Sequence, residues 1–520
     1  MCGIVGYVGS EQAAPILLDG LARLEYRGYD SAGIAVVSPR HELQVKKTVG
    51  RLKALSDLVH GGADVEGTIG MGHTRWATHG APNDVNSHPH VSENGKFAVI
   101  HNGIIENYVE LKEFLISQGV TFRSETDTEV VAQLLEFYYN ECHDFLEAVG
   151  RVLRRIEGAY ALGMLCADCP DRIIAARKDS PLIVGLGEDG NYIASDIPAI
   201  LPYTRRVYLL EEGEMAQVFA DHVEIYDMDG ERMEKEVYEV TWSVDAAERG
   251  GYPHFMLKEI FEQPRVIVDG LTGRVDPEEG SVRLRGLDSL NVPERLHIVA
   301  CGTSYHAGLW GRYLIENWAQ IPVQVEIASE FRYRDRLLLG KKDMVLVISQ
   351  SGETADTLAA LRIAKKNGVP LLGLCNVVGS SIAREADSVL YTQAGPEISV
   401  ASTKAMCSQM LMLCLMALYW GERRGVTDAG FRKSVIRSLL DLPGKLEKAL
   451  PDMHEKAREL SRKYARAKNF FYLGRGHCYP MALEGALKLK ELSYIHAEGY
   501  AAGEMKHGPI ALIDQTFPTF

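Results

Sequence analysis

The sequence predicts an α+β domain followed by two α/β domains, and three observations lead to this prediction. Residues 1–240 hold short apolar runs, such as Ile4–Val8 and Ala161–Cys166, interrupted by Gly, Pro and Asn, a pattern typical of strands and turns. Farther along, apolar strands alternate with helical segments, which indicates βαβ units and parallel sheets. The strand–turn–helix pattern of residues 297–318 recurs at 470–492, which indicates an internal repeat.

The N-terminal part is expected to combine antiparallel sheets with helices. The runs Gly33–Val37 and Phe97–His101 are typical of strands, while Ala13–Leu24 and Thr128–Tyr139 have helical periodicity. Helices that stack on antiparallel sheets make an α+β domain.

In the remaining chain, the alternation of apolar strands and helical segments predicts doubly wound parallel sheets. The apolar strand Leu296–Ala300 precedes CGTSYHAG, and Met344–Ile348 precedes SQSGET. A long amphipathic helix, Leu442–Ala467, leads into the second copy, which stops at Phe520 before it repeats all of the first. We therefore expect four segments in order: the α+β domain at 2–240, a Gly- and charge-rich linker at 241–285, an α/β domain at 286–435 and an incomplete second one at 436–520.

The composition of the chain argues against some binding partners and indicates the cellular compartment. The 520 residues carry a formal net charge of −14, so no basic surplus is present to neutralise nucleic-acid phosphates. The N-terminus lacks the features of a signal peptide, and the apolar run Met410–Trp420 is too short for a membrane span of about 20 residues. The nine cysteines are scattered, as expected for reduced thiols in the cytoplasm. We interpret the Cys166–Cys169 CxxC as a chance pair in a loop.

Cys2 is the first candidate catalytic residue. If Met1 is removed, Cys2 carries a thiol and a free α-amine, and the amine can serve as the thiol's general base. The thiolate is the reactive form of cysteine. An isolated cysteine near a terminus is more often inert, so the surrounding sequence has to support this hypothesis.

Three further motifs supply groups that amide hydrolysis needs: GHTRWATHG, IHNGIIEN and SETDTE, the last opening a helix with Asp127 in its first turn. The Asn102 amide and the Gly103 N–H suit a tetrahedral oxyanion. Arg75 can bind an α-carboxylate bidentately, and Asp127 can pair with an α-ammonium. Taken singly, Asn102–Gly103 is more typical of a turn and Asp127 of a helix start.

A metal site is a weaker alternative in the same region. His73, His79, His88 and His90 are close in sequence but lack an HExxH arrangement. We expect no metal and no cofactor.

Taken together, Cys2-Gly-Ile-Val-Gly, YRGYDS, HTRWATHG, HNGIIEN and ETDTE resemble the class II glutamine amidotransferases, whose N-terminal-nucleophile (Ntn) domain is a four-layer αββα sandwich. The resemblance implies Cys2 as nucleophile, with Asn102 and Gly103 forming the oxyanion hole. It implies that glutamine is held by Arg75 and Asp127, with help from Arg27, Trp76, Thr78 and His79, and that Trp76 helps to gate an ammonia channel.

The C-terminal half predicts an anion-binding site. Ser349, Ser351 and Thr354 lie where a buried strand meets a helix, so their hydroxyls and the free helix amides can cradle a phosphate. Thr303 and Ser304 occupy the equivalent turn of another strand. Neither a GxxxxGK[ST] nor a GxGxxG motif is present, which argues against nucleoside triphosphates and dinucleotides. Such hydroxyls are also common as simple helix caps.

Lys488 and Glu491 are three residues apart and are expected on one helix face. They are either a surface ion pair or an acid–base pair that moves a proton between adjacent sugar carbons. His507, in a Gly-flanked loop, could assist sugar-ring opening.

SQSGET, VASTKA and ALEGALKLKE are similar to SIS sugar-phosphate isomerase domains. One amidotransferase domain followed by two SIS domains resembles the family of glutamine-dependent enzymes that convert fructose 6-phosphate to glucosamine 6-phosphate. The resemblance implies that Glu491, Lys488 and His507 act on the sugar. It also implies a homodimer, and that the sugar phosphate is bound by Thr303, Ser304, Ser349, Gln350, Ser351, Thr354, Val400 and Ser402.

One departure from the resemblance concerns the C-terminus. Family members continue past this point, and their tail supplies a lysine that forms an imine with the sugar. We therefore keep an alternative open at this stage: a sugar-phosphate-binding regulatory protein, or a glutaminase without transfer.

Overall fold

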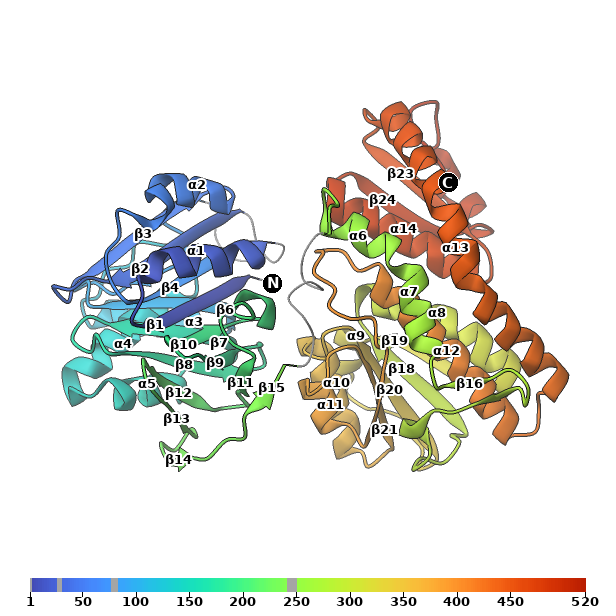
Figure 1. The fold of residues 1–520 in the computed structure, drawn as a ribbon, viewed down its shortest axis with the longest axis horizontal. Coiled ribbons are helices and arrows are strands. Elements are labelled where there is room, and N and C mark those ends of the chain that lie inside the picture. The colour runs from blue at the N-terminus through green and yellow to red at the C-terminus, as the bar shows by residue number, and fades with distance from the viewer. Residues whose placement is uncertain (1, 26–29, 76–82, 241–249) are drawn as a thin grey trace. The chain divides into compact units, whose positions relative to one another are not determined.

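The computed structural model describes residues 2–25, 30–75, 83–240 and 250–520. The chain forms two compact units, Met1–Ala247 and Glu248–Phe520 (Figure 1).

The first unit contains two antiparallel sheets. Among the described residues, the first sheet has the order β15-β11-β9-β10-β1-β4-β2-β3 and the second the order β14-β13-β12-β8-β7-β6-β5. The first consists of β1 (Gly3–Gly9), β2 (Ser31–Val37), β3 (Leu43–Val49), β4 (Ile69–Arg75), β9 (Ile183–Leu186), β10 (Gly190–Ala194), β11 (Arg206–Leu209) and β15 (Tyr238–Glu239). The second consists of β5 (His90–Val91), β6 (Phe97–Ile105), β7 (Gly158–Cys166), β8 (Arg172–Lys178), β12 (Met215–Phe219), β13 (Val223–Tyr226) and β14 (Arg232–Met233).

Helices cover the outer faces of both sheets. In β1, Val5 and Tyr7 pack toward α1 (Ala13–Arg23) and α2 (Leu52–Leu58), whereas Ile4 and Val8 pack between the sheets. This alternation follows the period of two in a strand. The second sheet carries α3 (Tyr108–Ser117), α4 (Glu129–Cys142) and α5 (Phe145–Leu153) on its other face. The four layers αββα confirm the predicted fold of this part.

The second unit is built on a parallel sheet of order β19-β18-β20-β21-β22. Leu296 and Ile298 of β18 face one apolar cluster and Val299 faces another, so helices bury both sides, as a doubly wound sheet requires. The strands are β18 (Arg295–Ala300), β19 (Val323–Ile327), β20 (Asp343–Ser349), β21 (Leu371–Cys375) and β22 (Ser388–Tyr391). The helices are α8 (Gly302–Leu314), α9 (Ala328–Arg332), α10 (Ala355–Lys366), α11 (Ser381–Glu385) and α12 (Lys404–Arg423).

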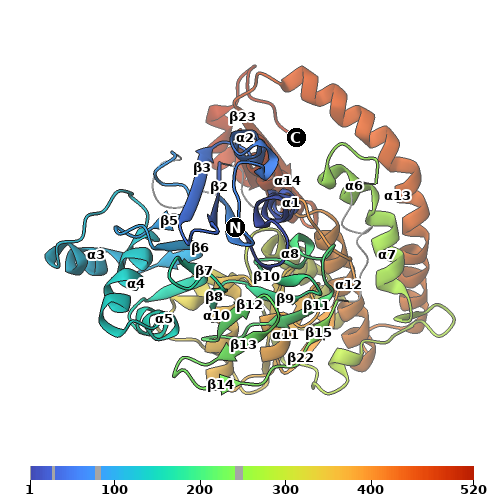
Figure 2. The same ribbon diagram turned by 60° about the vertical axis from the view of Figure 1, so that its left-hand side comes forward.

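The predicted repeat is present as β23 (Asn469–Gly474), α14 (Cys478–Ser493) and β24 (His496–Ala501), whose two strands pair in parallel. The preceding helix α13 spans Ala429–Tyr464 and begins earlier than predicted, because the Asp428 side chain caps it. It packs along α7 (Gln263–Leu271), which follows α6 (Phe255–Phe261) and precedes the small hairpin of β16 (Val275–Asp276) and β17 (Ser281–Val282) (Figure 2). In the described part of the chain, no helix is long and apolar enough to cross a membrane.

Candidate functional sites in the two units

Cys2 and Asn102 lie together in the first unit, although 100 residues separate them in sequence. Cys2 directly precedes β1, and Asn102 lies in β6 of the other sheet. The Asn102 Nδ2–H donates a hydrogen bond to the Cys2 carbonyl oxygen over 2.8 Å. The contact between the two sheets therefore brings the candidate nucleophile beside a side-chain amide that can stabilise an oxyanion.

The neighbouring Gly103 has a backbone that only glycine adopts easily. Its φ is 137°, and a Cβ placed there would lie 1.9 Å from the Ala159 carbonyl oxygen. Any side chain would displace the β6–β7 pairing beside Asn102.

Arg75 and Asp127 are both buried in the same unit. Arg75 ends β4, which pairs with β1 beside Cys2. The Asp127 carboxylate accepts a hydrogen bond from the Ile105 N–H over 2.8 Å. The sequence prediction for its position is wrong by a few residues: α4 begins only at Glu129, so Asp127 precedes the helix. The Glu129 carboxylate accepts the N–H groups of Arg123 and Ser124, which holds this turn outside the helix.

Four further residues of the predicted glutamine site, Arg27, Trp76, Thr78 and His79, lie outside the described residues.

The histidines of this region that the structure describes, His73, His88 and His90, are buried and neutral. Burial lowers the pKa of His73 to about 3 and holds those of His88 and His90 well below the usual range. No group of three metal-ligating side chains occurs among the described residues.

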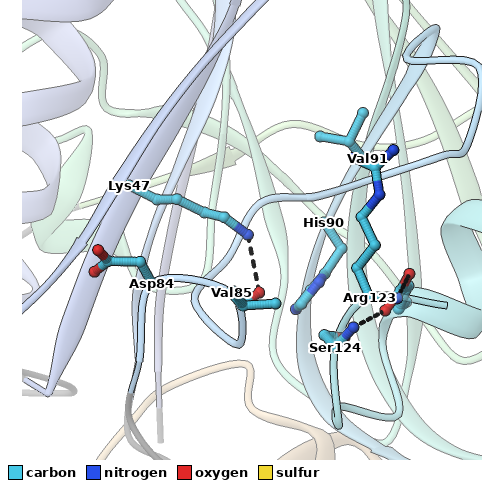
Figure 3. A pocket seen from close by; sticks show the side chains of 8 residues that line it. Lys47, Asp84, Val85, His90, Val91, Arg123 and Ser124 are labelled. Carbon is cyan, nitrogen blue, oxygen red and sulfur yellow. Dashed lines mark hydrogen bonds between the residues drawn. The ribbon is translucent and has the colours of Figure 1, made fainter.

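A cavity of about 300 Å³ opens beside these histidines, between β3 and the turn before α4 (Figure 3). On one wall the Lys47 ammonium donates to the carbonyl oxygens of Val85, Ser87 and Pro89, so its three donors are used. Burial lowers the pKa of Lys47 to about 8. Lys47 therefore fastens the loop that carries His88 and leads into β5, and it is not a free cation for a ligand.

In the second unit, the predicted phosphate turn lies at the carboxyl end of β20. The Ser349 hydroxyl accepts the Gly352 N–H over 3.0 Å and lies 2.9 Å from the Thr354 hydroxyl. Gly352 has a φ of 67°, and a Cβ there would lie 2.0 Å from the Ser380 hydroxyl oxygen. Hydrogen bonds of its own hydroxyl groups thus fix the shape of this turn, which connects β20 to the start of α10.

Thr303, Lys488 and Glu491 meet where α8 packs against α14. The Lys488 ammonium donates to Glu491 Oε2 over 2.6 Å and to the Thr303 hydroxyl over 3.1 Å. The two α/β repeats thereby contribute to one polar cluster, and the sequence alone offered no means of pairing α8 with α14.

Glu484 and His306 complete this cluster, and sequence reasoning missed both. Glu484 accepts hydrogen bonds from the Thr303 hydroxyl over 2.9 Å and from His306 Nδ1 over 2.8 Å. Burial alone would raise the Glu484 pKa, but the His306 hydrogen bond, the Lys488 charge and the Thr303 hydrogen bond lower it overall. A signal was available in ALEGALKLKE, because Glu484 lies four residues before Lys488 on the same helix face.

The other predicted sugar-phosphate residues are less closely joined. Ser304 accepts a hydrogen bond from Gln409 over 3.0 Å, and Ser402 donates to Glu397 over 2.8 Å. Gln350 and Ser351 are half-buried, while Val400 and His507 are exposed. Within the described residues, no hydrogen bond joins His507 to Lys488 or Glu491.

Comparisons with known proteins give the family. The family model of the glutamine amidotransferase domain matches residues 40–241, and that of the SIS domain matches 289–419 and 463–520. The glutamine–fructose-6-phosphate aminotransferase [isomerizing] of Caldanaerobacter subterraneus subsp. tengcongensis is 54% identical over 99% of this chain and 84% of its own length. The chain belongs to this aminotransferase family.

Other members agree with this assignment. An enzyme of the same name from Thermus thermophilus is 52% identical over 100% of this chain and 85% of its own length. Among solved structures, the C-terminal domain of glucosamine-fructose-6-phosphate aminotransferase from Francisella tularensis is 41% identical, with a TM-score of 0.50, and covers 52% of this chain and 77% of that one. The family resemblance of the sequence motifs is therefore confirmed.

Proposed function

We propose that this chain releases ammonia from glutamine at Cys2 and uses it to convert fructose 6-phosphate into glucosamine 6-phosphate. The observation that carries the proposal is the 2.8 Å hydrogen bond from the Asn102 amide to Cys2, in a chain that also carries the Thr303–Lys488–Glu491 cluster. Family membership supports the same activity. The reaction needs no cofactor.

In the glutaminase step, the α-amine freed by removal of Met1 takes the proton of the Cys2 thiol. The thiolate attacks the carboxamide carbon, and the oxyanion accepts hydrogen bonds from Asn102 Nδ2 and the Gly103 N–H. Ammonia leaves, and water then hydrolyses the thioester. Arg75 binds the glutamine carboxylate and Asp127 its ammonium, assisted by Arg27, Trp76, Thr78 and His79, with Trp76 also gating the passage of ammonia.

In the sugar step, the strand-to-helix turns hold the phosphate and α14 supplies the acid–base groups. Glu491 transfers a proton between C2 and C1, Lys488 assists it, and His507 promotes ring opening. The hydrogen-bonded cluster with Thr303 supports the roles of Glu491 and Lys488. The phosphate and sugar hydroxyls are bound by Thr303, Ser304, Ser349, Gln350, Ser351, Thr354, Val400 and Ser402.

We infer further that the protein is a cytoplasmic homodimer with no nucleic-acid or membrane partner. The net charge of −14 disfavours nucleic acid. The regulatory and glutaminase-only alternatives are not favoured, because the relatives that cover the chain are named as aminotransferases.

The Cys2→Ala variant tests this function. With glutamine and fructose 6-phosphate, the wild-type protein should form glucosamine 6-phosphate, measured by mass spectrometry, and the variant should form none. Ammonium salt should restore product formation in the variant, because the sugar site is unchanged. Glutamine-dependent product from the variant would contradict the assigned nucleophile, and no product from the wild type under either condition would contradict the function.

A further inference from the structure

His73 lies directly behind the Asn102 side chain. It belongs to β4, where its backbone pairs with Ile4 and Gly33, and its side chain is fully buried. Its Nε2 lies 3.0 Å from Asn102 Oδ1 and 3.1 Å from the His101 carbonyl oxygen. The amide of Asn102 is therefore held between Cys2 on one side and His73 on the other.

The partners of His73 fix its tautomer. A backbone carbonyl oxygen can only accept a hydrogen bond, so the His73 Nε2 must carry a proton. The other ring nitrogen, Nδ1, is buried and has no hydrogen-bond partner among the described residues. At a buried position without a partner, an unprotonated ring nitrogen costs less free energy than an N–H group that has no acceptor. Burial lowers the pKa of His73 to about 3, which agrees with a neutral ring whose single N–H is at Nε2.

This tautomer determines which way the Asn102 amide faces. The His73 Nε2–H lies within hydrogen-bond distance of two acceptors, the His101 carbonyl oxygen and Asn102 Oδ1, so the Asn102 group that faces it has to be the oxygen. If the amide turned over, its NH₂ group would face the His73 N–H and its oxygen would face the Cys2 carbonyl oxygen. Both contacts would then be repulsive in a buried site, where unmade hydrogen bonds cost about 1–3 kcal/mol each. The NH₂ group is thus directed at Cys2.

The His73 ring also contacts His88. His88 Nδ1 lies 3.2 Å from His73 Nε2, and the two ring centroids are 4.2 Å apart. The loop that carries His88 is fastened to β3 by the three hydrogen bonds of Lys47. The His73 ring therefore packs against a loop whose position is fixed by hydrogen bonds.

We propose that His73 is a positioning residue that orients the Asn102 amide for oxyanion stabilisation. The proposal rests on the glutaminase function proposed above. It adds a residue that does not contact glutamine but acts through Asn102.

The test is a double-mutant cycle on glutamine hydrolysis, measured as glutamate release by the full chain. His73→Phe keeps an aromatic ring but removes the N–H, so kcat should fall roughly 10- to 100-fold, short of the about 100- to 1,000-fold expected for Asn102→Ala, with KM changed less than about 2-fold. Because His73 acts through Asn102, adding His73→Phe to Asn102→Ala should lower kcat by less than about 2-fold further. His73→Gln retains an N–H and should recover part of the lost kcat.

His90→Phe is the matched control, because His90 is equally buried but bonds to the Thr126 hydroxyl and not to Asn102. Its kcat should stay within about 2-fold of the wild type. If His73→Phe does not fold, His73→Gln and His73→Met are compared, since only Gln offers an N–H. Equal kcat values in that pair, or an additive cycle, would overturn the proposal. Failure of the glutaminase function itself would be distinct: the wild type would release no glutamate, or Cys2→Ala would retain the activity.

Discussion

Glu484 is a buried carboxylate that links helices of the two α/β repeats. It lies in α14 and accepts hydrogen bonds from Thr303 and His306 of α8, and the Lys488 ammonium is 3.3 Å away. Because its pKa is lowered overall by these partners, it is ionised at neutral pH. Its charge therefore helps to hold Lys488 beside Thr303 and Glu491.

We predict that Glu484→Gln lowers the kcat of ammonia-dependent glucosamine 6-phosphate formation about 10-fold. The amide keeps the shape of the side chain but no longer holds the ammonium as a carboxylate does, and a hydrogen bond to a charged group contributes about 1.5–3 kcal/mol. Glutamine hydrolysis should change less than about 2-fold.

The control for this prediction is Glu459→Gln, which breaks an exposed pair with Lys456 on α13 and should be nearly silent, as exposed pairs are. Equal kcat values for the two variants would show that Glu484 has no part in the sugar site.

At the scale of elements, the strands β4, β5 and β6 bring three buried histidines together. His73, His90 and His101 lie one on each strand, and His88 precedes β5. Burial lowers the pKa of each. The nearby cations Lys47 and Arg75 add to the effect on His90, while Asp127 opposes it at His101.

This arrangement predicts that the first unit loses stability as the pH falls below about 6.5. Between the lowered folded pKa and the unfolded value of 6.5, the unfolded chain binds protons that the folded chain does not. The free energy of unfolding therefore decreases as the pH is lowered through this range, by up to about 1.4 kcal/mol per pH unit for each histidine. Urea unfolding at pH 7 and 5.5, with hydrogen exchange of peptides from β4 and β6, measures the loss.

His90→Phe removes one of these titrating groups and should make the dependence on pH less steep. A free energy of unfolding for β4 and β6 that is the same at pH 7 and 5.5 would contradict neutral buried histidines.

At the scale of the whole molecule, two residues of the proposed sugar site are not buried by the second unit itself. The Glu491 side chain is 34% exposed, and His507 lies on the surface. Proton transfer to carbon benefits when bulk water is excluded from the site. A second copy of the chain would supply a cover, which is the physical support for the proposed homodimer.

We therefore expect sedimentation analysis to give twice the chain mass of 57.6 kDa. Dilution to the monomer should lower the kcat of the sugar step while glutamine hydrolysis persists. A monomeric protein with full transferase activity would contradict the proposed homodimer.

Much of this protein could be predicted from local patterns. The α+β class of the first part follows from strands with a period of two, and the doubly wound sheet follows from βαβ units. The αββα layers were implied by the resemblance of the motifs to a known family. The candidate residues Cys2, Asn102, Lys488 and Glu491 lie in motifs whose chemistry is recognisable along the chain. Element boundaries were predicted unevenly: α13 begins at its Asp428 cap, well before the predicted Leu442, whereas α4 begins at Glu129, one residue after the predicted Thr128.

The sequence by itself determined the fold class of each part, because fold class depends on periodicity. Its short motifs, through their resemblance to a known family, gave the family, the layers and the candidate chemical groups. Only the tertiary structure decided which groups meet. His73 reaches Asn102 because β4 and β6 lie in sheets that face each other, and Glu484 reaches His306 because α14 packs on α8. Such contacts depend on packing between elements distant in sequence, and no local spacing specifies them.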